Sequence, residues 1–172
     1  MRTLTTSRLR LEPIVARHLD FLVELDGDAQ VLRHILGRAR TEAEARDFWT
    51  PQVPGPMWVG YVEDEPVGWW SLWPREGGAA ELGYRLAGRW WRQGLAVEGA
   101  RAVLAEGFAD PGLDVVRAET MVVNTGSRGV MRRLGMREVR IEVREWEDPL
   151  PGAELGEVIS EITRQDWAST AS

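Results

Sequence analysis

The stretch that decides the fold is residues 79–108, which read AAELGYRLAGRWWRQGLAVEGARAVLAEGF. Residues 79–86 are predicted to form a strand, and the segment after it contains Gly94. From residue 95 onward the chain has the pattern of an amphipathic helix, with one apolar side made of Val97, Ala100, Val103, Leu104 and Phe108. The sequence therefore predicts a strand, a glycine loop and a helix in direct succession.

A second unit of the same kind follows along the chain. Residues 113–123 are rich in valine and suit a buried strand, and Asn124 opens a helix that Gly135 ends. Two such junctions lie at the carboxyl ends of neighbouring strands, where free N–H groups at helix starts face a crevice. We expect an anion to dock there.

The rest of the chain adds further strands and short helices around these two units. Strands are expected at 8–12, 58–62, 67–73, 136–146 and 157–162. Helices are expected at 15–26 and 29–36, and a third begins at the capping box formed by Thr41 and Glu44. With 172 residues, of which 44% are hydrophobic, the chain is predicted to form one α/β domain spanning 1–172.

The composition excludes several classes of function. The formal net charge of −6 argues against a nucleic-acid partner. All 21 basic residues are arginine, so the chain has no lysine for a Schiff base or a phosphate loop. It also has no cysteine, which removes disulfides, thiolate nucleophiles and cysteine metal sites, and we predict no metal site. No apolar stretch has the length of a signal or a membrane span, so we expect a cytoplasmic protein without a membrane partner.

Three motifs occur in a fixed order: ELGYRL at 81–86, WWRQGLAVEGA at 90–100 and NTGSRGVMRRLGM at 124–136. Together they resemble the GNAT superfamily of N-acetyltransferases, in the branch that includes the ribosomal-protein N-terminal acetyltransferases. The opening TSRLRLEP at 6–13 and the segment after the last strand resemble that branch too. The resemblance implies a mixed, mostly antiparallel, splayed sheet of six to seven strands flanked by about four helices.

The resemblance also implies where acetyl-CoA, the acyl donor, binds. Its pantetheine arm is expected along the strand that ends near Leu86 and Ala87, and beside Asn124 and Ser127. Its pyrophosphate is expected on a loop whose small residues allow backbone N–H groups to approach an anion. That loop consists of Arg92, Gln93, Gly94, Leu95, Ala96 and Val97.

Two positions depart from the family pattern. Trp91 stands where the wider superfamily has Gln or Arg, which affects the donor little because the main chain makes the main contacts. Met131 stands where many members have a tyrosine that protonates the departing thiolate. Methionine has no proton to give, so the acid is expected to be Ser127 or solvent.

An amine must lose its proton before it attacks a thioester. Glu81, at the start of one strand, and Glu119, in the neighbouring valine-rich strand, are the candidate bases, with Glu81 preferred and acting through water. The alternative is that both are structural and solvent takes the proton. His18 and His34 lie far from both junctions in sequence, so a packing or surface role is favoured for them.

Several other features allow two interpretations. Trp69, Trp70, Trp73, Trp90 and Trp91 fit core packing or an aromatic wall for the acceptor, with Trp49, Trp58 and Trp146 as weaker wall candidates. Arginines on the second helix are either solvated or near the 3′-phosphate of the donor: Arg128, Arg132 and Arg133. Acidic loops at 63–65 and 145–148 favour a cationic acceptor or are simply acidic surface.

Two functions compete on this evidence. The first is acetyl transfer from acetyl-CoA to a primary amine, either a protein N-terminus or a small molecule, by direct attack in a ternary complex. The second is a non-catalytic acyl-CoA-binding regulatory protein of the same fold, supported by Met131. Retention of Glu81, Asn124 and Ser127 favours catalysis. A homodimer is also expected, from the supply of aromatic residues and its frequency in the resembled branch.

Overall fold

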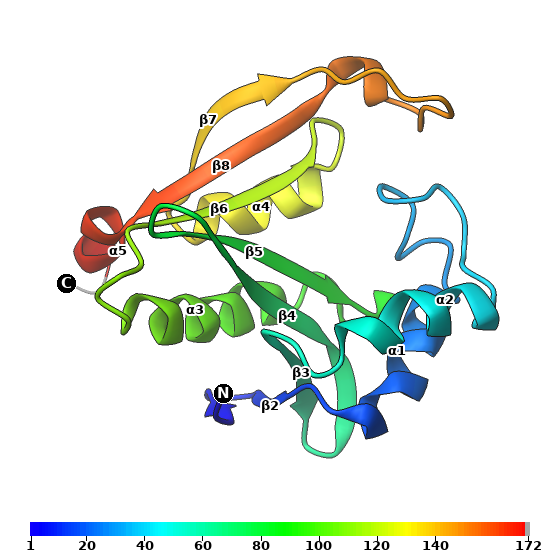
Figure 1. The fold of residues 1–172 in the computed structure, drawn as a ribbon, viewed down its shortest axis with the longest axis horizontal. Coiled ribbons are helices and arrows are strands. Elements are labelled where there is room, and N and C mark those ends of the chain that lie inside the picture. The colour runs from blue at the N-terminus through cyan, green and yellow to red at the C-terminus, as the bar shows by residue number, and fades with distance from the viewer. Residues whose placement is uncertain (171–172) are drawn as a thin grey trace.

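The computed structural model describes residues 1–170, which form one eight-stranded sheet with five α-helices (Figure 1). The strands are β1 Leu4–Thr5, β2 Arg10–Pro13, β3 Met57–Val62, β4 Glu65–Arg75, β5 Ala79–Leu86, β6 Val115–Met121, β7 Arg137–Glu142 and β8 Glu157–Thr163. The helices are α1 Leu19–Asp26, α2 Glu42–Trp49, α3 Leu95–Phe108, α4 Thr125–Arg133 and α5 Arg164–Thr170. Short 3₁₀ turns lie at Ala16–His18, Thr50–Gln52, Gly88–Trp90 and Ala153–Leu155.

The strand order across the sheet is β1-β2-β3-β4-β5-β6-β8-β7, and every neighbouring pair is antiparallel except β5 and β6. The parallel pair holds together over only three positions, from Ala79 opposite Val115 to Glu81 opposite Arg117. Beyond them the strands diverge, and Figure 1 shows the β6–β8–β7 half swinging away from the β1–β5 half. The predicted fold class, a mixed and splayed sheet, is confirmed.

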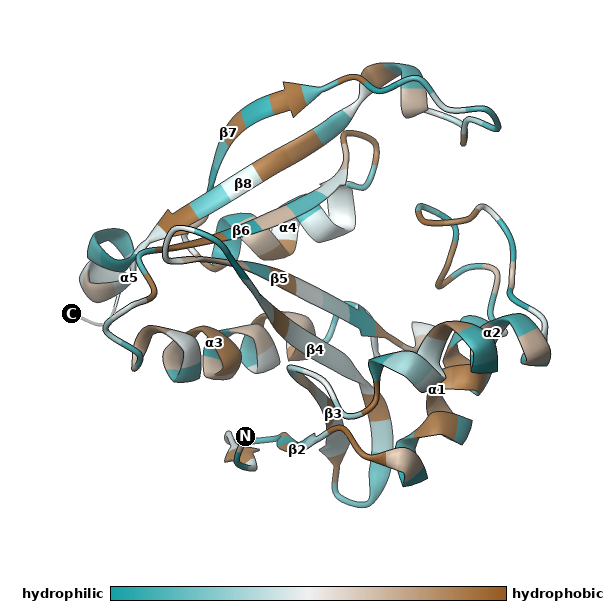
Figure 2. Cartoon of the chain, in the orientation of Figure 1, coloured by the Kyte–Doolittle hydropathy of each residue, from teal (hydrophilic) through white to brown (hydrophobic). Residues whose placement is uncertain are grey.

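Helices cover both faces of the β1–β5 half. The larger core lies between the sheet and α3, and contains Trp70, Leu82 and Val103. A second core lies under α1 and α2, around Leu22 and Trp49. Figure 2 shows brown, apolar residues recurring along α3, which covers one of these faces.

The helix α3 lies unusually close to β4 because of one glycine. A Cβ placed on Gly99 would stand 2.4 Å from the indole of Trp70, so only glycine fits there. The indole N–H of Trp70 in turn donates to the carbonyl of Ala96 at 3.1 Å. This contact fixes the start of α3 against the sheet, and with it the loop before the helix.

The structure confirms most of the predicted elements and corrects three. Thr41 caps α2 and exchanges the two predicted capping hydrogen bonds with Glu44. The expected helix at 29–36 is wrong: these residues form a series of turns that begins when the Asp28 carboxylate accepts from the backbone N–H of Gln30. There are eight strands and five helices in the described residues, more than expected, because the two-residue β1 and the terminal α5 carry no strong periodic signal.

Candidate active site

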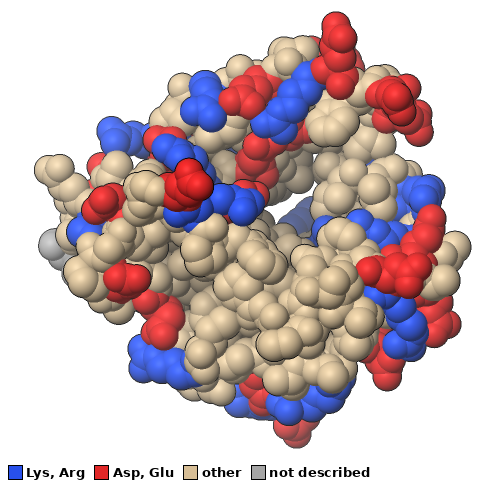
Figure 3. All heavy atoms as spheres, viewed as in Figure 1, with Lys and Arg blue, Asp and Glu red and all other residues tan. Residues whose placement is uncertain are grey.

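The candidate site is the wedge where β5 and β6 separate. After Glu81 the edge of β5 that faces β6 has no strand partner, although its other edge stays paired with β4 as far as Leu86. The space-filling view shows a deep hollow between the two halves of the molecule (Figure 3). Unpaired backbone groups along a strand can pair with an extended, amide-containing ligand in the manner of an added strand.

The loop after β5 presents a second ligand-ready feature. Gly94, with φ of 83°, is the N-cap of α3, and no side chain caps that helix start. Arg92 also has a positive φ of 61°. The first N–H groups of α3 therefore have no side-chain acceptor, which leaves the positive end of the helix dipole suited to an anion such as a pyrophosphate.

The amino-terminal segment braces this helix start. Glu98, in the first turn of α3, accepts hydrogen bonds from Thr6, Ser7 and the backbone N–H of Arg8. The Arg8 guanidinium also pairs with Glu98 at 2.6 Å and donates to the carbonyl of Gln93 at 2.9 Å. The negative charge of Glu98 is thereby offset, so it does not oppose an anion at the helix start.

Main-chain groups of Leu86 and Ala87, two of the predicted donor contacts, already have hydrogen-bond partners within the chain. The carbonyl of Leu86 accepts from the indole of Trp91 at 2.8 Å, and the N–H of Ala87 donates to Val67 at 3.0 Å. The free edge of β5 therefore lies earlier, at residues 82–85.

Asn124 and Ser127 lie at the start of α4, on the β6 side of the wedge. The Asn124 side chain caps α4 by accepting from the backbone N–H of Ser127 at 3.1 Å, and donates to Thr120 at 3.0 Å. Across the wedge, Tyr84 of β5 places its hydroxyl 2.8 Å from the Ser127 hydroxyl and 3.2 Å from the Ser127 carbonyl. This bond joins the two sides of the wedge.

Tyr84 is the residue that the sequence analysis missed. Burial raises the pKa of Tyr84 to about 12, against a smaller lowering by its hydrogen bond with Ser127. A phenol with such a pKa stays protonated at neutral pH, so it can act as a hydrogen-bond donor. The even spacing from Leu82 and Leu86 places Tyr84 on the α3 face, which is a signal that the strand pattern contained.

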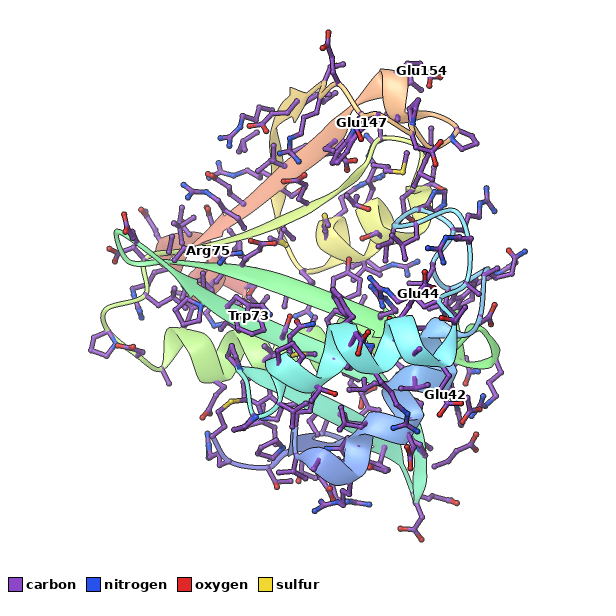
Figure 4. All side chains as sticks on the ribbon, turned by 45° about the vertical axis from the view of Figure 1, so that its right-hand side comes forward. Glu42, Glu44, Trp73, Arg75, Glu147 and Glu154 are labelled. Atoms are coloured by element: carbon purple, nitrogen blue, oxygen red, sulfur yellow. The ribbon has the colours of Figure 1, made fainter. Side chains whose placement is uncertain are left out.

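Glu81 lies at the closed end of the wedge, on the opposite face of β5 from Tyr84. Arg75, at the end of β4 (Figure 4), makes both of its contacts to Oε2 of Glu81, at 2.5 and 3.1 Å. The side chain is 46% exposed. The second carboxylate oxygen is thus left for water or a substrate.

Glu119 is held more completely. Arg144 contacts both of its oxygens, Oε2 at 3.1 Å. Close by, burial and the charge of Glu119 raise the pKa of Glu157. Glu81 and Glu119 lie on the same face of the sheet, whereas Ser127 and Tyr84 lie on the other, so the structure brings the hydroxyls together and keeps the carboxylates apart from them.

Most of the remaining candidates are buried or have partners within the chain. Met131 is buried in the main core at 3% exposure, and Trp49, Trp58 and Trp70 are buried as well. Arg128 pairs with Glu138 of β7, and the carbonyl of Arg133 accepts from Arg101 of α3. His18 is buried, and its Nδ1 accepts from the backbone N–H of Val15 at 3.0 Å.

Aromatic side chains line the face of the sheet under α1 and α2. Trp69 and Trp73 of β4 remain half-buried there, and the ring of Trp69 meets that of Trp49 edge-on at 5.6 Å. The loop at Gly37 touches the loop at Leu150, since a Cβ at Gly37 would lie 2.6 Å from the Leu150 side chain. Two loops from opposite halves thus meet across the opening.

The family comparison agrees with this geometry. Residues 8–137 match the acetyltransferase (GNAT) domain family. The chain belongs to that family. It is 38% identical to an FsC-acetyl coenzyme A-N(2)-transacetylase of Aspergillus fumigatus, over 96% of this chain and 77% of that protein. The chain is therefore an acetyltransferase, and its resemblance to this family at the sequence level is confirmed.

Solved structures of lower identity share the fold. The RimL ribosomal L7/L12 alpha-N-protein acetyltransferase in complex with coenzyme A is 17% identical, with a TM-score of 0.78 over 94% of this chain and 97% of that one. The spermidine N-acetyltransferase of Vibrio cholerae, in complex with CoA and spermine, is 15% identical, with a TM-score of 0.79 over 95% and 99%. No helix in residues 1–170 is long and apolar enough to cross a membrane, and the same residues contain no group of three acidic or histidine side chains arranged for a metal ion.

Proposed function

We propose that this acetyltransferase moves an acetyl group from acetyl-CoA to a primary amine by direct attack in a ternary complex. The observation that carries the proposal is the wedge, in which an unpaired strand edge leads to a helix start without a side-chain cap. The amides of the pantetheine arm can pair with the strand edge, and the pyrophosphate at the end of the arm can bind at the helix start. In this proposal the pantetheine lies along residues 82–85. The pyrophosphate lies on the N–H groups of the loop 92–97.

Ser127 and Tyr84 supply hydrogen bonds to the leaving sulfur. When the C–S bond breaks, the sulfur takes the electron pair, and a neighbouring hydroxyl donor stabilises the resulting thiolate. Because the Tyr84 pKa is about 12, complete proton transfer from it to a thiolate is unfavourable. We therefore assign the pair to hydrogen bonding, with the final proton taken from solvent.

Glu81 takes a proton from the acceptor ammonium, through water, and the neutral amine then attacks the thioester. The second oxygen of Glu81 is not held by Arg75, and it lies at the closed end of the wedge, at the last paired position of β5 and β6. Glu119 is assigned to structure because Arg144 holds both of its oxygens. The test is the ratio of effects: Glu81→Gln should lower kcat by roughly tenfold to a hundredfold, whereas Glu119→Gln should leave it nearly unchanged. Equal losses would contradict this assignment.

The acceptor is proposed to be a small molecule with a primary amine at its second position. The support is the 38% identical relative, whose name specifies an N(2)-transacetylase. Figure 4 shows Glu147 and Glu154 on the carboxy-terminal loops of the β6–β8 half, and these acidic side chains would attract a cationic amine. A protein N-terminus is the other acceptor to test. A cytoplasmic location stays a prediction.

The competing proposal is a regulatory protein that binds acyl-CoA without turnover. The buried Met131 in place of the family tyrosine favours it. The Tyr84–Ser127 bond weighs against it, because it provides the hydroxyl donors that the methionine lacks.

Thiol release from acetyl-CoA distinguishes the two proposals. The purified chain is assayed against polyamines, N(2)-amines of amino-acid-like compounds and short peptides, with Tyr84→Phe as the matched control. Amine-dependent thiol release that falls in the control supports catalysis. Tight acetyl-CoA binding without amine-dependent release from any acceptor would contradict it.

A further inference from the structure

Within residues 1–170 the strand β7 is the outermost strand of the sheet, and no strand of that part of the chain pairs with its outer edge. Its apolar side chains are exposed: Val139 at 47%, Ile141 at 57%, and Val143 just beyond the strand at 67%. Figure 2 shows β7 banded in hydrophobic and hydrophilic residues at the periphery of the molecule. An exposed, apolar edge strand is a template for pairing with another chain.

The sequence of this edge is complementary to itself. Residues 138–144 read Glu-Val-Arg-Ile-Glu-Val-Arg. If two copies lie antiparallel with Ile141 opposite Ile141, then Arg140 faces Glu142 of the second copy and Val139 faces Val143 of the second copy. Every charge in this register meets its opposite, and every apolar side chain meets another. A register shifted by two residues on either strand loses this matching.

We propose that a second copy of this chain docks on β7, in antiparallel pairing about a two-fold axis at Ile141. A two-fold axis requires a self-complementary surface, which this strand has. The pairing would join two eight-stranded sheets into one. This inference does not depend on the proposed acceptor or on catalysis.

The local geometry suits this docking. Arg140 and Glu142 lie on one face of the sheet, because they pair with Ile159 and Glu157 of β8, and Ile141 lies on the other face, opposite Val158. The register shift between Glu138 and Arg140 limits the regular part of the strand to its carboxyl end. The regular part of the docking surface is therefore Arg140–Glu142, and it is extended by the bulged Val139 and by Val143 just beyond the strand. Arg140 and Glu142 already pair with each other at 2.7 Å in the same chain, so in the dimer each would contact a partner in both copies.

Docking at β7 would also reach the candidate active site. Arg144, which directly follows this surface, pairs with Glu142 at 2.6 Å and with Glu119 of β6. The loop that continues from it touches Gly37 through Leu150. A second copy that fixes β7 would thus also fix one wall of the wedge.

The first experiment measures mass by sedimentation equilibrium at micromolar concentration. The wild-type chain should sediment at twice its monomer mass of 19.4 kDa. Ile141→Arg places two arginines against each other at the axis and should raise the dimer Kd by at least about a hundredfold. The matched control, Val15→Arg, changes another exposed apolar residue far along the chain and should leave the dimer intact. A monomeric wild type, or a dimer equally strong in Ile141→Arg, would overturn the proposal.

A charge exchange tests the register itself. Arg140→Glu and Glu142→Arg each put like charges opposite one another, so each should weaken the dimer by about tenfold or more. The double variant restores opposite charges in the exchanged order and should recover most of the wild-type affinity. Losses that simply add in the double variant would overturn this register, even if the protein is dimeric.

Discussion

The two halves of the sheet use charged residues in opposite ways. In the β1–β5 half, Asp26 is fully buried between Arg40 and Arg85 and also accepts from the indole of Trp49 at 3.0 Å. In the β6–β8 half, the pair Glu119–Arg144 lies on an open face. Burial makes the first cluster hard to replace, whereas exposed pairs contribute little to stability. The first half therefore buries its charged cluster, whereas the second half exposes its ion pair.

The largest effect on stability is expected when the buried cluster of Asp26, Arg40 and Arg85 is broken. Asp26→Asn leaves two arginines, each about a tenth exposed, without their carboxylate, and should lower the free energy of unfolding by about 3–5 kcal/mol. Asp20→Asn, on the same helix but 85% exposed, is the matched control and should leave stability unchanged. Urea unfolding measures both. Similar stability in the two variants would remove the contrast between the halves.

Acid should weaken the same half through His18. Burial, helped by the charge of Arg17, lowers the pKa of His18 from 6.5 to about 4. The unfolded chain therefore binds a proton at higher pH than the folded chain, so stability is complete above pH 6.5 and falls as the pH drops towards 4. The loss at pH 4 should be about 3 kcal/mol.

His18→Asn is the control for this titration, because its side-chain oxygen can still accept from the backbone N–H of Val15. The variant should lose part of the pH dependence between 6.5 and 4, whatever its stability at neutral pH. An unchanged pH dependence would show that other groups cause the acid loss.

The hydroxyl pair across the wedge links the halves, and its removal should act on rate rather than on stability. Ser127→Ala and Tyr84→Phe should each lower kcat by roughly tenfold to a hundredfold, with little change in acetyl-CoA affinity, when chemistry limits the rate. The double variant should be little slower than either single one, because the two groups share one bond.

Met131→Tyr should restore part of the rate in Ser127→Ala if the ring fits the core. An unchanged kcat in both single variants would contradict the assignment of these two hydroxyls to the leaving sulfur.

The smallest effect is expected in the open half. Glu119→Gln should change the free energy of unfolding by less than about 1 kcal/mol, since Arg144 keeps its bond to Glu142. Thermal unfolding of Glu119→Gln, measured alongside that of Asp26→Asn, checks this prediction. A loss as large as that of the buried cluster would mean that the open face also has a structural role.

Local patterns were enough to predict the elements that form the wedge. The strand 79–86, the glycine before α3 and the capping box at Thr41 act over a few residues, and the structure has all three. The helix prediction for 29–36 failed because Val31 and Leu32 are buried apolar residues, as in a helix that packs on a core, although the backbone of the segment forms turns. Apolar spacing indicates which residues are buried and does not by itself specify a helix.

Contacts between distant segments could not be read from the sequence. Tyr84 meets Ser127 only because α4 begins beside the edge of β5, 43 residues later in the chain. Arg75 reaches Glu81 across a hairpin turn, and Arg128 turns towards β7. The Tyr84–Ser127 contact in particular depends on how the two halves diverge, a property of the whole sheet.

The most direct test of the account is calorimetry of acetyl-CoA binding to Gly94→Val and Arg92→Ala. The central claim is that the main chain of the loop between β5 and α3 holds the pyrophosphate. At Gly94 the backbone has φ of 83°, which a branched side chain strains, and the valine would also obstruct the N–H groups. The account predicts a loss of affinity of about a hundredfold or more for Gly94→Val and at most about tenfold for Arg92→Ala. Equal losses, or a larger loss for Arg92→Ala, would contradict it.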